Sequence, residues 1–318
     1  MKRGKREGND LSRFIFIRLK ANPTMNLMTF FQLIVGGLSI GSIYGLVALS
    51  YNVIFSTTNV INFAQGELVM VGALLGFTFY VVFKLPLLLA LVLTAVVVSF
   101  LALVVERISV RPVKDISQNF IWIMSTFGFG VALKNSAMLI WGRSPLPFPK
   151  FVGGNEPIPV FGVLILPQEI GIFFIAVICT VGLELYRKKT IFGTAVRATA
   201  LDRETASIMG INTSYVIYFS FAISGILAAI CGILVSPITF ADPTMGIMLG
   251  VKGFVAIILG GLGSVTGAIL GGLFLGLIET FSATLISSLW KDVITFLILI
   301  LVMLIKPSGF FGRHRVIG

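Results

Sequence analysis

The residues best suited to chemistry lie at the head of an apolar run, in the stretch Ile61 to Phe77, which reads INFAQGELVMVGALLGF. Two amides, Asn62 and Gln65, and one carboxylate, Glu67, stand where the hydrophobic segment begins. Such groups can hydrogen-bond a polar substrate, or they can satisfy backbone groups that a helix break leaves without partners. The stretch therefore predicts a broken helix beside a solvated translocation path, with these three residues as candidate lining residues.

Ionisable side chains within the apolar runs are few: Glu67, Lys134, Lys252 and Glu279. Such groups are costly within a bilayer and usually face a bundle interior or an aqueous cavity. Because Glu67, Lys252 and Glu279 flank glycine-rich segments, we expect these three around a central cavity, as candidate residues of the path. An equally open alternative is structural, in which each caps a broken helix or pairs with another helix. The four residues are too few for a proton relay.

Composition indicates that the elements holding these residues cross a membrane. The 318-residue chain is 57% hydrophobic and only 12% charged, with a mean hydropathy of +1.02, whereas about a quarter of a soluble domain is charged. Uncharged runs such as Leu85 to Val105 reach the length of about 20 residues that a spanning helix needs. We predict an all-α, polytopic helical membrane protein with about 8 transmembrane helices and at least one broken or re-entrant segment.

Metal and nucleophile chemistry are not indicated by the sequence. Cys179 and Cys231 lie in apolar runs without metal-ligand spacing, and His314 is the single histidine. The apolar runs contain no HExxH motif, no Ser/His arrangement and no paired aspartates. We therefore predict no catalytic residue, no metal site and no enzymatic activity of the chain itself.

The net charge of +11 is carried by four short segments, at residues 1–20, 106–115, 184–205 and 306–318, and not by a nucleic-acid-binding surface. Basic excess beside spans marks the cytoplasmic side, so both termini are predicted to be cytoplasmic and the number of spans even. Nine apolar segments are nevertheless found, at residues 29–55, 59–83, 85–105, 117–141, 163–186, 214–240, 247–263, 264–287 and 292–305. The conflict lies before residue 106. Residues 29–83 hold either three short spans or one piece that enters and leaves on the same side.

This patterning predicts three parts. Residues 1–28 form a basic cytoplasmic arm, which either contains an interfacial helix or only fixes orientation. Residues 29–306 form the transmembrane domain, and residues 307–318 form a basic cytoplasmic tail.

Glycines recur at four-residue spacing in both halves of the chain. On a helix this spacing leaves one face without side chains, so that the backbone of a second helix can approach closely. An alternative is that such thin helices line a path or slide against a partner. The glycines for which we predict helix packing are Gly37, Gly41, Gly45, Gly263, Gly267 and Gly271.

A charged segment between two apolar runs differs from the other connections. Residues 194–209 hold four alanines and no proline or glycine, which favours a helix of about four turns. Gly210 supplies a stop, and Asn212 to Ser214 supply caps for the next span. We predict a cytoplasmic helix at about residues 193–210 that docks a soluble partner. Its candidate residues are Gly193, Arg197, Asp202, Arg203, Glu204 and Gly210.

Four motifs, in order, resemble one family. VINFAQGELVMVGAL is similar to the NFAHGE segment of branched-chain amino acid permeases of ATP-binding-cassette importers, and FGTAVRATALDRETASIMGIN resembles their cytoplasmic coupling segment. GVKGFVAIILGGLGSVTGAILGGLFLGLIET resembles their C-terminal glycine-rich signature, and WKDVITFLILILVMLIKPSGFFG their last span. The resemblance covers about residues 30 to 313 and is strongest to the first of the two permease subunits of such an importer.

The resemblance implies a multi-pass protein of a bacterial or archaeal plasma (inner) membrane that passes branched-chain or other small apolar amino acids. The implied partners are a second permease subunit, two cytoplasmic ATPase subunits and an extracytoplasmic solute-binding protein. Because the chain has no GxxxxGK[ST] phosphate loop, we expect it to bind no cofactor, with ATP used by the ATPase subunits. Under this interpretation Arg197, Asp202, Arg203 and Glu204 lie on the helix that receives the ATPase stroke.

One residue departs from the family pattern. Gln65 stands where the family often has histidine, so no role of a titratable imidazole carries over. A neutral amide can still hydrogen-bond a substrate or the backbone. The departure therefore bears on the exact substrate more than on transport.

Two alternatives stay open at this point. Within the importer family, urea or short amides are alternative substrates. A stand-alone secondary transporter or channel would share the spans, the glycine faces and the broken helix. Such a protein has no evident need for the charged cytoplasmic helix.

Overall fold

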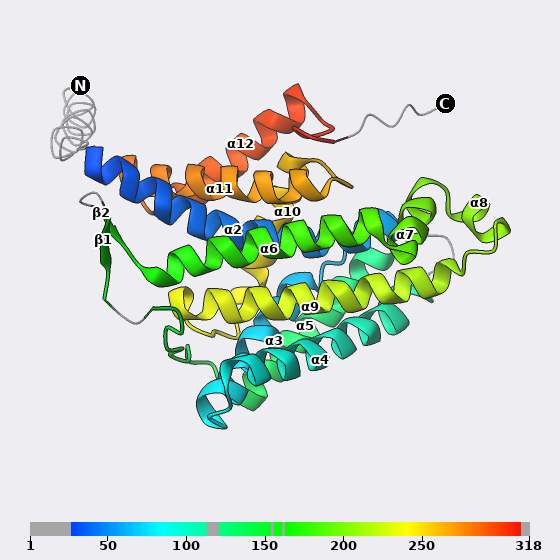
Figure 1. The fold of residues 1–318 in the computed structure, drawn as a ribbon, viewed down its shortest axis with the longest axis horizontal. Coiled ribbons are helices and arrows are strands. Elements are labelled where there is room, and N and C mark those ends of the chain that lie inside the picture. Colours follow the sequence, from blue (N-terminus) through cyan, green and yellow to red (C-terminus); the bar gives the residue numbers. More distant parts are fainter. Residues whose placement is uncertain (1–26, 113–120, 154–155, 161–162, 313–318) are drawn as a thin grey trace, which may run out of the picture.

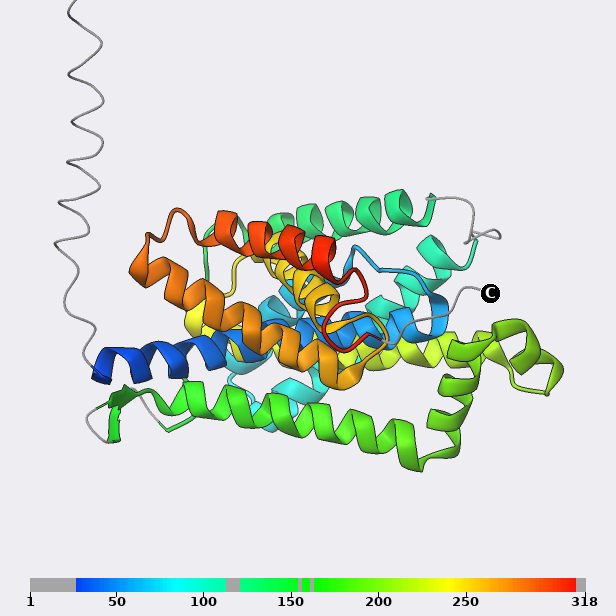
Figure 2. The same ribbon diagram turned by 90° about the horizontal axis from the view of Figure 1, so that it is seen from above.

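The computed structural model describes residues 27–112, 121–153, 156–160 and 163–312. These residues form a bundle of long helices that run in roughly one direction, with a small β-hairpin at one end (Figures 1 and 2). Most of the predicted N-terminal arm, together with residues 313–318 of the predicted tail, lies outside the described residues.

The helices follow the predicted apolar segments. The elements are α2 (Leu27–Thr58), α3 (Gln65–Phe77), η1 (Thr78–Val82), α4 (Leu87–Val105), η2 (Glu106–Val110), α5 (Ile121–Trp141), β1 (Ile158–Val160), β2 (Val163–Ile165), α6 (Pro167–Lys189), α7 (Ile191–Leu201), α8 (Arg203–Ile208), α9 (Thr213–Thr239), α10 (Met245–Gly260), α11 (Val265–Leu285) and α12 (Lys291–Ile305). Within the described ranges, 7 helices are long and apolar enough to cross a membrane, counting α3 with η1 and α4 with η2. The predicted all-α polytopic fold is confirmed.

The helix break predicted within INFAQGE is also confirmed. α2 ends at Thr58, Asn59 adopts a left-handed φ of 55°, and α3 begins at Gln65. The connection leads back into the bundle, where α3 starts (Figure 2). Residues 29–83 therefore hold two helical crossings with a break between them. They form neither three short spans nor a piece that returns to the same side.

The two ends of the described chain lie at opposite ends of the bundle (Figure 1). At one end, beside the hairpin, the ring of Phe30 packs on Phe281 near the end of α11. At the other end, which carries α7, the Phe310 N–H donates to the carbonyl oxygen of Leu259 at 2.8 Å. Within the described residues the helices thus do not give the even number of crossings predicted from the basic segments. For both termini to lie on the same side of the membrane, residues outside the described ranges would have to cross it.

The centre of the bundle is made by α2, α3, α9, α10 and α11, which pack mainly on one another. The outer helices α4, α5, α6 and α12 turn large apolar side chains outward. Examples are Val96, Leu139, Phe174 and Leu304. In water such a surface would favour aggregation, so these outer faces are the ones that contact lipid or partner subunits.

Glycine faces bring α2 and α11 into backbone contact. A Cβ at Gly41 would lie 2.7 Å from Leu273 Cα and 2.8 Å from the carbonyl oxygen of Gly272. Gly37 and Gly45 face the same helix, at Leu277 and Ile269. Because real Cβ atoms essentially never approach backbone this closely, only glycine permits the observed separation of these two helices.

The remaining predicted glycines behave differently from one another. Gly267 and Gly271 face the backbone of α10 at Gly260, so they are packing residues of a second helix pair. Gly263 has a φ of 85° in the turn between α10 and α11, and no atom lies within 4 Å of its ideal Cβ position. Its N–H donates to Oδ1 of Asn52 at 3.0 Å. Gly263 is therefore a turn residue and not a helix-packing residue, because this backbone conformation favours glycine.

The contact between α2 and α11 predicts a matched pair of variants. Gly41→Ala is expected to destabilise the protein by about 1–3 kcal/mol, because the added methyl group overpacks against α11. Gly36→Ala, on the same helix with open space at Cβ, is expected to be neutral or to stabilise by up to about 1 kcal/mol. Thermal unfolding in detergent measures both. Equal midpoints for the two variants would contradict the close contact.

Candidate functional site

The amides at the break satisfy each other and the broken backbone. Oδ1 of Asn62 accepts the Ala64 N–H at 3.1 Å, and its Nδ2 donates to Oε1 of Gln65 at 3.4 Å. Ser224 on α9 donates its hydroxyl to the same Gln65 oxygen at 3.0 Å and to the carbonyl oxygen of Ser50 on α2 at 3.0 Å. Asn62 and Gln65 are both fully buried. The amides thus close the gap between α2, α3 and α9.

Glu67 lies in the first turn of α3 and is buried, with 5% of its surface exposed. It packs between α5 and α10, since a Cβ at Gly130 would touch its Cγ and one at Gly246 would collide with its carboxylate. Its Oε2 makes no hydrogen bond within the described residues. Glu67 stands in the first turn of α3, and its carboxylate lies against Gly246 in the first turn of α10, so the N-termini of two helices face it. Its Oε2 is therefore a buried acceptor that no described residue satisfies.

A second break, which the sequence analysis missed, precedes α10. Phe240 ends α9 with a φ of 64°, and Oδ1 of Asp242 accepts the Thr244 N–H at 2.7 Å. Ala241 exchanges backbone hydrogen bonds with Leu146 of the loop after α5. The Asp-Pro pair at 242 and 243 is a turn signal that could have revealed this break.

The two breaks meet inside the bundle. A Cβ at Gly66, in the first turn of α3, would run into the backbone of Gly246 and Gly250 on α10. Glycine on both sides therefore allows the two helix starts to touch. This contact places α10 against Glu67.

Lys252 and Glu279 pair with each other and not with Glu67. Nζ of Lys252 lies 2.6 Å from Oε1 of Glu279, and the Tyr44 hydroxyl donates to Oε2 of Glu279 at 2.8 Å. Lys291 lies 3.3 Å from Glu279, and Asp292 lies 3.1 Å from Lys252. Two lysines and two carboxylates thus join α10, α11 and α12 in a network with equal numbers of positive and negative side chains. The hydroxyl of Tyr44 links this network to α2. The sequence analysis did not select Tyr44, Lys291 or Asp292.

The three charged residues expected around one cavity therefore form two separate groups. The first turn of α10 faces Glu67 through Gly246, whereas Lys252 faces α2 and α11 through Tyr44 and Glu279. α10 lies between the groups.

The predicted cytoplasmic helix is two helices, α7 and α8, and the prediction of one continuous helix is wrong. Asp202 leaves the helical conformation, with φ −153° and ψ 113°. Its Oδ1 accepts the N–H groups of Glu204 and Thr205 at 2.9 and 3.1 Å. An aspartate that captures these donors ends one helix and caps the next. The stop at Gly210 is observed, with a φ of 86°, and Asn212 caps α9.

α7 is fixed to the bundle, while α8 projects from it. A Cβ at Gly193 would meet the backbone of Tyr186 and Arg187, so α7 packs tightly on the end of α6. The ring of Phe192 packs against that of Phe219 on α9, with centroids 4.7 Å apart. Arg197 is half-buried and donates to the Thr194 hydroxyl, and Arg203 and Glu204 are exposed. α7 and α8 also leave large apolar side chains exposed, namely Ile191, Leu201 and Ile208.

Comparisons with known proteins identify the family of this chain. A family model described as the permease component of the branched-chain amino acid transport system matches residues 33–303. The chain is 33% identical over 299 residues to BraD, a high-affinity branched-chain amino acid transport system permease protein of Pseudomonas aeruginosa, covering 90% of this chain and 97% of BraD. It is equally similar, with the same coverage, to LivH, the corresponding protein of Escherichia coli strain K12.

More distant matches extend the comparison. The probable permease LivH of the archaeon Methanocaldococcus jannaschii is 29% identical, covering 87% of this chain and 91% of the relative. Among solved structures, PsaBC from Streptococcus pneumoniae in complex with Fab matches with a TM-score of 0.45 and 10% identity, covering 88% and 92% of the two chains.

Fold and site together define a polytopic membrane transport protein. The chain belongs to the family of branched-chain amino acid transport system permease components.

The charged network predicts unequal effects of its two lysines. Lys252→Met is expected to destabilise the protein by about 3–5 kcal/mol, because it leaves the buried carboxylate of Glu279 without its main cation. Lys291→Met is expected to cost at most about 1 kcal/mol, because the Lys291 side chain is 38% exposed. Unfolding in detergent measures both, and equal losses would contradict the central place of Lys252.

The cap at Asp202 predicts a second contrast. Hydrogen bonds from the Thr205 hydroxyl and from the N–H groups of Thr205 and Glu204 lower the pKa of Asp202. Its capping is therefore present above the ordinary aspartate pKa and lost as pH falls through the lowered value. At neutral pH Asp202→Ala should speed amide hydrogen exchange at Glu204 and Thr205, whereas Asp202→Asn should preserve their protection, since asparagine caps equally well. Protection unchanged in Asp202→Ala would contradict the cap.

Proposed function

We propose that this chain is the membrane-spanning permease subunit of an ATP-binding-cassette importer and forms part of the path for branched-chain or other small apolar amino acids. The family match over residues 33–303 and the names of the bacterial and archaeal relatives support the substrate class. They do not favour urea or short amides. The proposed location is the plasma (inner) membrane.

The path runs past the break at residues 59–64. An amino acid carries an ammonium group, a carboxylate and an apolar side chain. Glu67 offers a carboxylate oxygen without a hydrogen bond in the described residues, which suits the ammonium group. Asn62 and Gln65 already hydrogen-bond to each other, to the backbone and to Ser224. Their role is therefore to stabilise the non-helical backbone of the break beside Glu67. Lys252 and Glu279 hold α10 from its other side.

The segment α7–α8 is the proposed docking site of the cytoplasmic ATPase subunits, which use the ATP. The observation that carries this proposal is the exposure of Leu201 and Ile208, 82% and 81%, on either side of the charged residues Asp202, Arg203 and Glu204. A polar segment with exposed apolar side chains is typical of a protein interface. Arg197, Arg203 and Glu204 supply charge around it.

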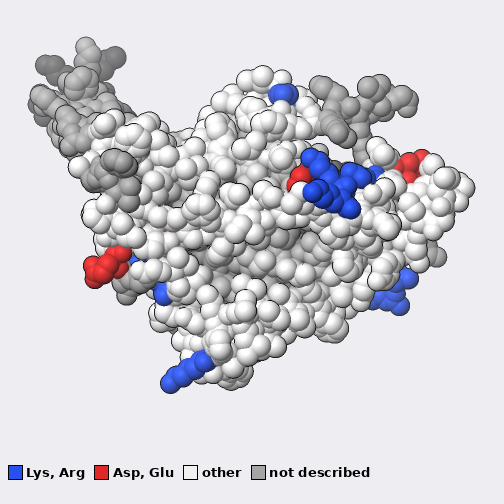
Figure 3. Space-filling view, viewed as in Figure 1, with Lys and Arg blue, Asp and Glu red and all other residues white. Residues whose placement is uncertain are grey.

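The distribution of charge supports a cytoplasmic location for this end of the bundle. Figure 3 shows basic side chains gathered toward the end that carries α7 and α8, and a largely uncharged flank. The basic residues of this end are Arg107, Arg111, Arg187, Lys188, Lys189, Arg197, Arg203 and Lys306. The positive-inside rule then assigns the hairpin end to the outside. That end would receive the solute-binding protein, and a second permease subunit would complete the path.

Docking predicts the effect of one substitution on the assembled transporter. Ile208→Glu is expected to reduce ATPase recovery with the tagged chain, and ATP-driven leucine uptake in proteoliposomes, by about tenfold or more, because it places a charge in an apolar contact. Ile158→Glu makes the same change at the hairpin end and is expected to leave ATPase recovery unchanged. Full recovery with Ile208→Glu would contradict docking at α8. Uptake without ATP or partners would instead support a secondary carrier.

A further inference from the structure

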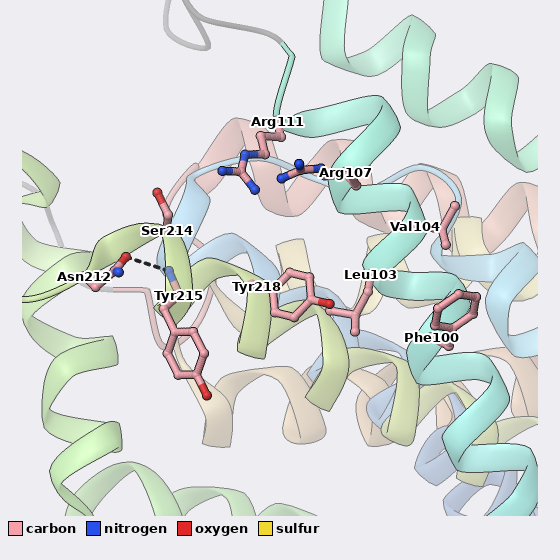
Figure 4. Close-up of a pocket in the computed structure, with 9 residues that line it drawn as sticks. All are labelled: Phe100, Leu103, Val104, Arg107, Arg111, Asn212, Ser214, Tyr215 and Tyr218. Atoms are coloured by element: carbon pink, nitrogen blue, oxygen red, sulfur yellow. Dashed lines mark hydrogen bonds between the residues drawn. The ribbon is translucent and has the colours of Figure 1, made fainter.

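A cavity of about 530 Å³ lies apart from the breaks, between α4 with η2 and the start of α9. It lies at the end of the bundle that carries α7 (Figures 1 and 4). Neither the proposed path nor the proposed docking of the ATPase uses it.

One side of the cavity is cationic. Arg107 and Arg111 are one helical turn apart at η2, and Figure 4 shows both guanidinium groups beside the cavity, across from Ser214 on α9. Both arginines are exposed, and within the described residues neither forms an ion pair. The buried carboxylate of Glu106 interacts with both and offsets part of their charge. The N-terminus of the 27-residue α9 adds positive potential.

The other walls are apolar and aromatic. Phe100 and Val104 lie on α4, one turn apart and toward the middle of the bundle from Arg107, and Phe100 is 63% exposed. Tyr215 and Tyr218 of α9 stand opposite and are also exposed. Tyrosines with an apolar body and a polar tip are typical of the membrane–water interface.

The order of the cationic and apolar groups along α4 and η2 indicates which class of ligand the cavity binds. Cationic groups at the bundle end, followed by an apolar wall on an outer helix, match a phosphate group followed by an acyl chain. A soluble anion would use the arginines but not the wall at Phe100 and Val104. A soluble protein partner would have to enter the level of the membrane, because α4 is an apolar spanning helix.

We propose that this cavity binds an anionic phospholipid of the cytoplasmic leaflet, with its phosphate at Arg107 and Arg111 and an acyl chain along Phe100 and Val104. The leaflet rests on the orientation given under the proposed function. The binding itself does not depend on transport, and its test needs no transport activity.

Native mass spectrometry of the full chain in detergent, titrated with phosphatidylglycerol or phosphatidylcholine, tests the proposal. The unsubstituted chain is expected to bind phosphatidylglycerol more tightly, and Arg107→Gln with Arg111→Gln to weaken that binding by about tenfold or more while leaving phosphatidylcholine unchanged. Lys188→Gln with Lys189→Gln is the matched control, with the same loss of charge near the same end, and should retain binding. Equal binding of the two lipids, or retention by the double arginine variant, would overturn the proposal.

A second variant separates a lipid from other occupants. Val104→Trp fills the apolar wall without changing charge, and it is expected to weaken phosphatidylglycerol binding while the chain remains monodisperse on size exclusion. Unchanged binding in this variant would identify an anion site that makes no contact with an acyl chain and would overturn the proposal. Loss of bound lipid on adding the ATPase subunits would identify a protein interface and would overturn it too.

Discussion

The centre of this protein depends on hydrogen-bonding the backbone of two helix breaks that lie inside a bundle from which water is largely excluded. Non-helical backbone at membrane depth persists only where protein or a hydrated cavity satisfies it. Asn62 and Thr58 meet this need at the first break, and Asp242 and Leu146 meet it at the second. Once both breaks are satisfied, α3 and α10 can begin within the bundle. Their starts touch through glycine, which leaves Glu67 facing two helix N-termini.

The same constraint relates the breaks to the rest of the molecule. α10 packs against Glu67 on one side and is held by the Lys252–Glu279 pair on the other, so a shift of this helix would disturb both contacts. α7 packs on α2 and α9, the two helices that the Ser224 hydroxyl joins to each other and to Gln65 at the start of α3. The docking segment therefore rests on the helices that hold the break.

Sequence patterns predicted what depends on local chemistry. Apolar runs gave the helices, the amide-rich head at Asn62 gave the first break, and Gly210 gave a helix stop. Sequence patterns failed where contacts with residues distant in the sequence determine the structure around a residue. Nothing local to Lys252 or Glu279 indicates that they pair across 27 positions and not with Glu67. Gly263 fits the four-residue spacing, but its φ shows a turn. Asp202 fits a helical run, yet its side chain competes for the backbone donors that would continue the helix. Basic segments predicted an even number of crossings, and the described helices do not provide it.

The proposed path depends on the carboxylate of Glu67, which we propose lines the route taken by the substrate. The most direct test is ATP-driven leucine uptake by the assembled transporter in proteoliposomes, with Glu67→Gln compared with the unsubstituted chain at equal ATPase recovery. The account predicts uptake reduced by about tenfold or more with assembly unchanged, because the amide keeps the shape but loses the charge that pairs with the substrate ammonium group. Unchanged uptake would contradict the claim and leave Glu67 as a structural cap of α3.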